Sequence, residues 1–269
     1  MQENASVHFT TRPAQNGKLL GIATLNRPKA LNALNLEMCE SLLAQCKRWQ
    51  QDDSIAAVVL RAEGEKAFCA GGDVAEVVKR VKSGGSDCFE YGDAFFTVEY
   101  ALDLLIHQFG KPFIALAQGI TMGGGMGLLA GASHRIVSTS ARIAMPEIHI
   151  GLFPDVGGGF FLNRLPCRAG WLMALTGQLV NEHDAMLAGL VDAAIPAAQF
   201  EPFLDFISQK IGAFDDLENQ RIVTNAMRDF VGRVAPDASH APMWQRMLQI
   251  HQIMHRATVT QVRDELLGG

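Results

Sequence analysis

Two glycine clusters, each following a short apolar run, constrain this chain more than any other feature. Residues 56–60 precede a loop that ends in Gly71-Gly72-Asp73, and residues 113–117 precede the triple glycine at 123–125. Short apolar runs bounded by charge or glycine are typical of buried strands, and helical patterns follow both clusters. The sequence therefore predicts an α/β fold in which glycine-rich turns join strands to helices.

Other segments fit this alternation. The runs at 7–11 and 19–25 predict a hairpin turning at Asn16-Gly17. Asn35 is expected to cap a helix, and residues 87–107 predict one long helix with an apolar stripe. Further helices are expected from Asp73 to residue 81, over 128–130 after the glycines, over 167–176, 181–188 and 200–211, and from 215 to the end; further strands are expected over 134–137 and 142–144. The change to helices alone predicts a core of residues 1–196 and an α-helical C-terminal region of residues 197–269.

The composition excludes several classes of protein. Of the 269 residues, 48% are apolar and 19% are charged, which is typical of a folded domain and not of a disordered chain. The net charge of −5 without a basic tract disfavours nucleic-acid and anionic membrane partners. The five cysteines have no CxxC spacing, which argues against a disulfide framework or a zinc site. With a polar, acidic N-terminus and no long apolar run, we expect a soluble, globular, cytoplasmic protein.

Two acids in the stretch 145–159 have the context of a catalytic pair. Glu147 and Asp155 each directly follow a proline, which stiffens the backbone, and mainly apolar residues separate them. Apolar surroundings raise the pKa of a carboxyl group towards neutrality, where it can exchange protons. Two solvated loop acids are the alternative, and the proline and apolar context favours the site. His149 lies between the acids, but the chain has no Gly-x-Ser-x-Gly elbow, so a serine-hydrolase triad is disfavoured.

The glycine clusters have two interpretations. Free backbone N–H groups at a helix start can bind an anion, and two clusters directed at one point would form an oxyanion hole. Alternatively, the glycines allow tight turns and close packing of helices, and the residues alone leave both interpretations open. The triple glycine lacks the dinucleotide pattern and the phosphate-loop lysine, which disfavours nucleotide hydrolysis.

Four motifs, in order, closely resemble the crotonase (enoyl-CoA hydratase/isomerase) superfamily over about residues 5–196. They are Asn26-Arg-Pro-Lys-Ala-Leu-Asn-Ala-Leu, Phe68-Cys-Ala-Gly-Gly-Asp, Gly119-Ile-Thr-Met-Gly-Gly-Gly and Met145-Pro-Glu. The resemblance implies a spiral of strand-strand-helix repeats with an α-helical C-terminal region. It also implies an acyl-CoA substrate, no metal or redox cofactor, and a homo-oligomer, either a trimer or a dimer of trimers.

The resemblance assigns roles to particular residues. The N–H groups of Gly72 and Gly124 match those that hold the thioester oxygen, and the loop with Lys29 and Ala30 matches the region that binds the adenine and ribose of CoA. Hydratases of this superfamily use two glutamates. One matches Glu147, whereas the position of the other holds Gly127.

The string Phe153-Pro-Asp-Val-Gly-Gly-Gly is similar to the branch that hydrolyses 3-hydroxyisobutyryl-CoA in valine breakdown. In that branch Glu147 and Asp155 match the catalytic acids and Glu99 matches a substrate-contacting glutamate, although its spacing alone suggests a solvated helix face. Members usually continue well beyond the point where this chain stops, so the acyl end of the pocket is where a difference is expected. The alternatives are an enoyl-CoA hydratase or isomerase, a non-catalytic acyl-CoA-binding protein, and an unrelated serine esterase.

Overall fold

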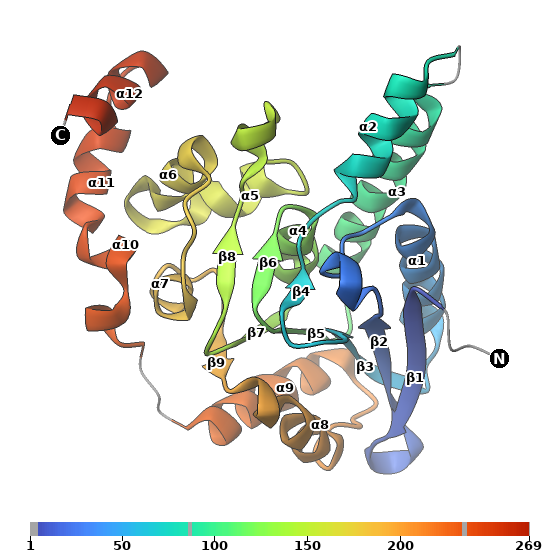
Figure 1. Ribbon diagram of the computed structural model, residues 1–269. Helices are drawn as coiled ribbons and strands as arrows, with labels where there is room; N and C mark the ends of the chain where they lie inside the picture. Colours follow the sequence, from blue (N-terminus) through green and yellow to red (C-terminus); the bar gives the residue numbers. More distant parts are fainter. Residues whose placement is uncertain (1–4, 86–87, 233–235, 269) are drawn as a thin grey trace.

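The computed structural model describes residues 5–85, 88–232 and 236–268, and within them the chain forms two β-sheets surrounded by helices (Figure 1). The larger sheet has six strands in the order β1-β2-β3-β5-β7-β9, and the smaller has three in the order β4-β6-β8. The strands are β1 (Val7–Pro13), β2 (Leu19–Leu25), β3 (Ile55–Ala62), β4 (Ala67–Cys69), β5 (Phe113–Ala117), β6 (Ile120–Met122), β7 (His134–Ser138), β8 (Arg142–Ala144) and β9 (Ala193–Ile195).

The two sheets are built from a repeated unit. The pairs β3–β4, β5–β6 and β7–β8 each place one strand in the larger sheet and the next in the smaller sheet before the chain becomes helical. Equivalent strands of successive units pair in parallel. This arrangement confirms the predicted α/β spiral of strand-strand-helix repeats.

The N-terminal hairpin is also confirmed. Strands β1 and β2 pair antiparallel from Val7 opposite Leu25 to Pro13 opposite Leu19. The turn between them contains Asn16 at φ 56° and Gly17 at φ 73°, left-handed conformations that asparagine and glycine adopt readily. Strand β2 then pairs in parallel with β3, which joins the hairpin to the repeats.

Helices cover both faces of the larger sheet. Side chains of β2, β3, β5 and β7 pack against α8 and α9 in one apolar cluster, and α1, α3 and α4 pack in another. Figure 1 shows α10 to α12 stacked along the side of the molecule away from the hairpin. The helices are α1 (Leu36–Gln51), α2 (Val74–Ser83), α3 (Glu90–His107), α4 (Gly124–Gly131), α5 (Gly158–Phe161), α6 (Ala169–Thr176), α7 (Glu182–Leu187), α8 (Phe200–Ser208), α9 (Asp216–Val231), α10 (Pro242–Gln245), α11 (Met247–Met254) and α12 (Val259–Gly268).

Several local predictions need correction. Strands β4, β6 and β9, of three residues each, were not predicted. Residues 215–268 are not entirely helical, since non-helical backbone follows α9 at Gly232. Asp73 stands at the start of α2, but its carboxylate accepts a hydrogen bond from Arg27 at 3.0 Å instead of capping the helix. The predicted start of the long helix at 87 lies outside the described residues, and α3 begins at Glu90.

Other local predictions hold. Asn35 caps α1 by accepting a hydrogen bond from the Met38 N–H at 3.0 Å. The spacing of Thr258 and Gln261 is that of a capping box, and the two residues exchange two hydrogen bonds of 3.2 Å at the start of α12. No helix among the described residues is long and apolar enough to cross a membrane. The division of the chain at residue 197 stays a prediction.

Candidate active site

The two glycine clusters converge, as expected from the motifs. A Cβ atom added to Gly124 would lie 3.4 Å from the Gly72 nitrogen and would collide with Glu99 Oε1. The same carboxylate oxygen lies 3.8 Å from a Cβ added to Gly72. Gly72 follows β4 and Gly124 begins α4, whereas Glu99 reaches them from α3. The structure therefore brings Gly72, Gly124 and Glu99 together.

The N–H groups of Gly72 and Gly124 are available to a ligand. Within the described part of the chain, neither group donates a hydrogen bond to the protein. Gly124 is the first residue of α4, where the N–H has no partner inside the helix. The preceding Gly123 has φ 50° and ψ −123°, a conformation that favours glycine. This turn presents a free donor beside the Gly72 turn.

Glu147 closes the other side of this turn. It starts a 3-10 turn, Glu147–Ile150, shortly after β8, and a Cβ added to Gly123 would lie 3.1 Å from its Oε1 atom. The side chain is buried, and Oε2 has no hydrogen-bond partner. Burial raises the pKa of Glu147 to about 7, the negative charge of Asp155 adds to the rise, and a hydrogen bond to its own backbone opposes it. A carboxyl group that titrates near neutrality can attack a carbonyl or accept a proton.

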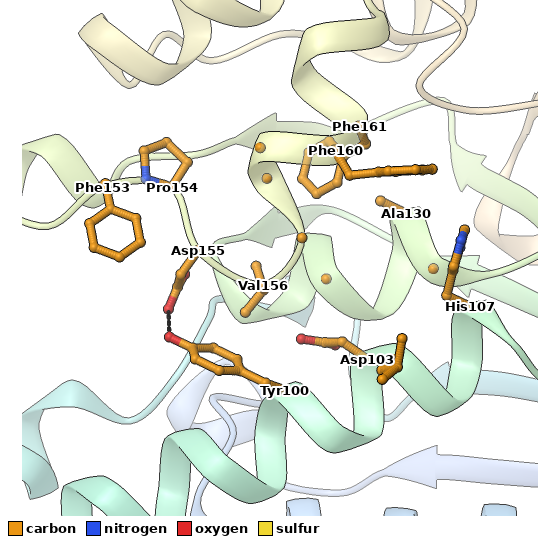
Figure 2. Close-up of a pocket in the computed structure, with 16 residues that line it drawn as sticks. Tyr100, Asp103, His107, Ala130, Phe153, Pro154, Asp155, Val156, Phe160 and Phe161 are labelled. Carbon is orange, nitrogen blue, oxygen red and sulfur yellow. Dashed lines mark hydrogen bonds between the residues drawn. The ribbon is translucent and has the colours of Figure 1, made fainter.

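Asp155 lies in the loop after this turn and is held by Tyr100. The Tyr100 hydroxyl, on α3, donates a hydrogen bond to Asp155 Oδ2 at 2.7 Å (Figure 2). Burial and this bond raise the pKa of Tyr100, so the phenol keeps its proton. The next residue, Val156, has φ 42°, which is strained for a β-branched residue. The loop thus fixes Asp155 in one orientation.

Asp155 and Tyr100 line a pocket of about 660 Å³ between α3, α4 and the loop before α5. Its wall is mostly apolar and includes Phe153, Phe160 and Phe161, with Asp103 as a further acid (Figure 2). Glu147 does not line this pocket, because its side chain lies against Gly123 at the start of α4. The pocket therefore has Asp155 on its wall, whereas Glu147 lies beyond it.

Position 127 has no room for a side chain. A Cβ added to Gly127 would lie 2.7 Å from the Val156 Cβ and 2.8 Å from each carboxylate oxygen of Asp103. Real Cβ atoms do not approach neighbours this closely, so Val156 and Asp103 can occupy these positions only because residue 127 is glycine. The position that holds the second glutamate of hydratases is thus filled here by groups from α3 and the Asp155 loop.

Glu99 and Asp103 are two buried acids one turn apart on α3. Glu99 Oε1 and both carboxylate oxygens of Asp103 have no hydrogen-bond partner. Burial, followed by the charges of Asp155 and Glu147, raises the pKa of Glu99 to about 8. Burial, followed by the charges of Glu99 and Asp155, raises the pKa of Asp103 well above its usual range. At pH 7 the Glu99 carboxyl group is therefore mainly neutral, and burial shifts the pKa of Asp103 in the same direction.

Sequence reasoning missed Tyr100 and Asp103. Phe95, Leu102 and Ile106 mark the buried face of α3, and positions 99 and 103 fall on that face at helical spacing. An acid on the buried, apolar face of a helix indicates a functional site, and this signal could have identified the residues at both positions. The solvated helix face suggested for Glu99 by spacing alone is wrong, because only 2% of this residue is exposed.

The other predicted residues lie outside this cluster. Lys29 and Ala30 are exposed in a 3-10 turn, Pro28–Ala30. Their loop reaches the site indirectly, since Leu34 exchanges backbone hydrogen bonds with the residues on either side of Gly72. The ring of His149 lies against Gly177.

Comparisons with known proteins show which family this chain resembles. The family model described as enoyl-CoA hydratase/isomerase matches residues 20–268. A mitochondrial 3-hydroxyisobutyryl-CoA hydrolase from Gallus gallus is 46% identical over 170 residues, 63% of this chain and 43% of the relative. One from Danio rerio is 40% identical over 198 residues, 73% of this chain and 51% of the relative. The chain thus spans about half the length of the curated relatives it matches.

Solved structures resemble the whole chain. An enoyl-CoA hydratase from Rhodobacter sphaeroides has a TM-score of 0.78 and 33% identity, covering 97% of this chain and 70% of that one. A carnitinyl-CoA dehydratase from Mycobacterium thermoresistibile has a TM-score of 0.79 and 30% identity at the same coverage. The curated relatives are named mitochondrial, so the cytoplasmic location stays a prediction. From its motifs, its strand-strand-helix repeats and these matches, the chain belongs to the enoyl-CoA hydratase/isomerase family.

Proposed function

We propose that this chain hydrolyses the thioester of a short 3-hydroxyacyl-CoA, such as 3-hydroxyisobutyryl-CoA, to the free acid and CoA. The observation that carries the proposal is the closed position at Gly127, where a hydratase would need its second glutamate. Asp155 instead supplies a carboxylate from the opposite loop. Relatives that are named for this hydrolysis and are 40–46% identical support the same reaction.

The proposed reaction begins at the glycine turns. The thioester oxygen accepts hydrogen bonds from the N–H groups of Gly72 and Gly124, which stabilise the charge that develops on it. The Glu147 carboxylate attacks the carbonyl carbon and expels the CoA thiolate, leaving a mixed anhydride. Water then cleaves the anhydride, which releases the acid and restores Glu147. In a second route, Glu147 accepts a proton from water that attacks the thioester directly.

Asp155 is assigned the role of positioning the attacking water molecule. Its Oδ2 atom already accepts a hydrogen bond from Tyr100, and its other oxygen can hold a water molecule. Protonation of the leaving thiolate is the alternative role. Hydroxylamine trapping followed by mass spectrometry of the Glu147 peptide separates the two routes, because only an anhydride would yield a modified glutamate.

CoA itself is part of the substrate, and the reaction as proposed uses no cofactor or metal. The nucleotide portion of CoA is assigned to the exposed turn with Lys29 and Ala30, by the family resemblance. A homotrimer or a dimer of trimers is proposed on the same ground.

Thiol release from a panel of acyl-CoAs, with mass spectrometry of the products, tests the function. Because the pocket of about 660 Å³ exceeds the needs of a four-carbon acyl group, the panel includes longer 3-hydroxyacyl chains. Release of CoA and the free acid from a 3-hydroxyacyl-CoA is expected. Fast hydration of crotonyl-CoA without thiol release would contradict the proposal.

An enoyl-CoA hydratase is the second candidate. Asp103 favours it, because its carboxyl lies where a side chain at 127 would begin and could serve as a second acid beside Glu147. A hydratase would consume the enoyl absorbance of crotonyl-CoA and leave the thioester intact.

The hydrolysis rate is expected to depend on the ionisation of Glu147. Both routes require the carboxylate, so kcat/KM should rise with pH and level off above a midpoint near 7, the pKa that burial gives this group. Loss of thioester absorbance from pH 5.5 to 9 measures it, and Asp93→Asn, an exposed acid on α3, is the control. A rate that falls as pH rises through 7 would contradict a carboxylate role.

Tyr100→Phe should lower kcat less than Asp155→Asn does. Asparagine at 155 cannot act as a base towards water, and a loss of about 10²-fold is typical of such a change. Phenylalanine at 100 removes only the hydroxyl that orients Asp155 Oδ2, so a smaller loss is expected. If both substitutions are combined, the losses should not add, because they act on the same group. Fully additive losses in initial-rate assays would mean that the two residues act separately.

A further inference from the structure

Asp103 has no function in the reaction described so far. Only 9% of this residue is exposed, and neither carboxylate oxygen has a hydrogen-bond partner. Burying a polar group without a partner destabilises a protein, so such a group is usually explained by a ligand or by chemistry. Asp103 also lines the pocket, where a bound molecule could reach it (Figure 2).

The packing of α3 against α4 places Asp103 at a defined distance from the thioester. Two contacts are in register: Glu99 lies over Gly124, and Asp103 lies over Gly127, one turn further along both helices. Three residues of α-helix span about 4.5 Å. If the thioester oxygen binds at Gly124, Asp103 therefore lies about three bonds further along the acyl group, a path that leads from the carbonyl oxygen to the third carbon.

The charges around the site indicate which end of the substrate enters the pocket. Among the residues that the structure describes, no lysine or arginine lines the pocket, whereas Asp103 and Asp155 do, so the phosphates of CoA are disfavoured there. The loop bearing Arg27 and Lys29 instead adjoins the site through Leu34 and the Gly72 turn. The acyl group therefore extends from Gly124 past Gly127 into the pocket.

We propose that Asp103 determines specificity by hydrogen-bonding the 3-hydroxyl of the acyl group. The inference rests on the proposed function for the choice of substrate class. A protonated carboxyl group can donate one hydrogen bond and accept another, and a hydroxyl group can return both. A substrate without the hydroxyl would leave the buried carboxyl unpaired, and sites of this kind discriminate strongly against such analogues.

Two substitutions at 103 and one control test the proposal. Asp103→Leu removes the hydrogen-bonding groups at similar size, whereas Asp103→Asn keeps one donor and one acceptor and serves if the leucine variant does not fold. Asp93→Asn, on the exposed side of α3, is the control. The substrates are 3-hydroxyisobutyryl-CoA and isobutyryl-CoA, which differ only in the hydroxyl.

The expected result is a change in discrimination. The wild type should prefer the hydroxylated substrate in kcat/KM, and Asp103→Leu should lower that preference by about 10- to 100-fold, through a loss on the hydroxylated substrate alone. Asp103→Asn should retain part of the preference, and Asp93→Asn all of it. Equal losses on both substrates with Asp103→Leu, or no preference in the wild type, would overturn the proposal.

A binding measurement separates this inference from the proposed function. Calorimetry with non-hydrolysable thioether analogues of the two acyl-CoAs gives the same ratio without turnover. If the wild type releases no thiol but the binding ratio depends on Asp103, the hydrolase assignment fails and the hydroxyl contact stands. If the wild type hydrates crotonyl-CoA and Asp103→Leu abolishes that activity, Asp103 is a second hydratase acid and the specificity role is wrong.

Discussion

Replacing Glu147 by glutamine is expected to lower kcat for thioester hydrolysis by about 10²- to 10⁴-fold, the range typical of a lost acid–base or nucleophilic group. Glutamine keeps the size of the buried side chain, but it can neither attack the carbonyl carbon nor accept a proton. Because the interaction matters in the transition state, KM should change little. Thiol release under saturating substrate measures the effect.

The control for this substitution is Glu40→Gln, an exposed glutamate on α1. It makes the same chemical change at a surface position outside the cluster of Gly72, Gly124, Glu99 and Glu147, and it should leave kcat unaltered. A Glu147→Gln variant that folds and hydrolyses the substrate at the wild-type rate would remove Glu147 from the mechanism. Glu99 and Asp155 would then be the candidates for the catalytic carboxylate.

Gly124→Pro is expected to lower kcat by about 10²- to 10³-fold, the effect of losing one oxyanion donor. Gly124 is the first residue of α4, a position where proline is well tolerated because the N–H has no helical partner. The substitution therefore removes the N–H with little cost to the helix. Rates with saturating acyl-CoA, together with CoA affinity, show whether catalysis is lost more than binding.

Gly124→Ala is the matched control. Alanine also places a Cβ against Glu99 Oε1, the mobile end of a side chain, but it keeps the N–H. Its kcat should stay well above that of the proline variant. If alanine and proline reduce kcat equally, the cause is crowding of Glu99, and the carbonyl is stabilised elsewhere.

The sequence predicted the parts of the fold and site that depend on local pattern. Glycine after an apolar run marked both turns, and prolines marked Glu147 and Asp155 as fixed acids. The motifs, through the family resemblance, brought Gly72, Gly124 and Glu99 to one place, and the structure agrees. The chemical roles of these residues stay predictions.

The remaining features depend on how helices pack. The contact of Asp103 with position 127 joins α3 to α4 across 24 residues of chain, and nothing in either segment alone indicates the register. The hydrogen bond from Tyr100 to Asp155 likewise exists only because the loop before α5 returns to α3. Strands β4 and β6 are too short to show alternation, and their partners, not their composition, define them.

The pairing of Leu34 with the Gly72 turn has a mechanical consequence. The Leu34 N–H donates to the Gly71 carbonyl at 2.8 Å, and the Asp73 N–H donates to the Leu34 carbonyl at 2.7 Å, so Gly72 is held from both sides. Residues 31–33 connect Leu34 to the turn that holds Lys29. A nucleotide bound at that turn would therefore restrict the motion of the Gly72 N–H group. Binding energy from the CoA nucleotide would then help to position the oxyanion donor at the thioester.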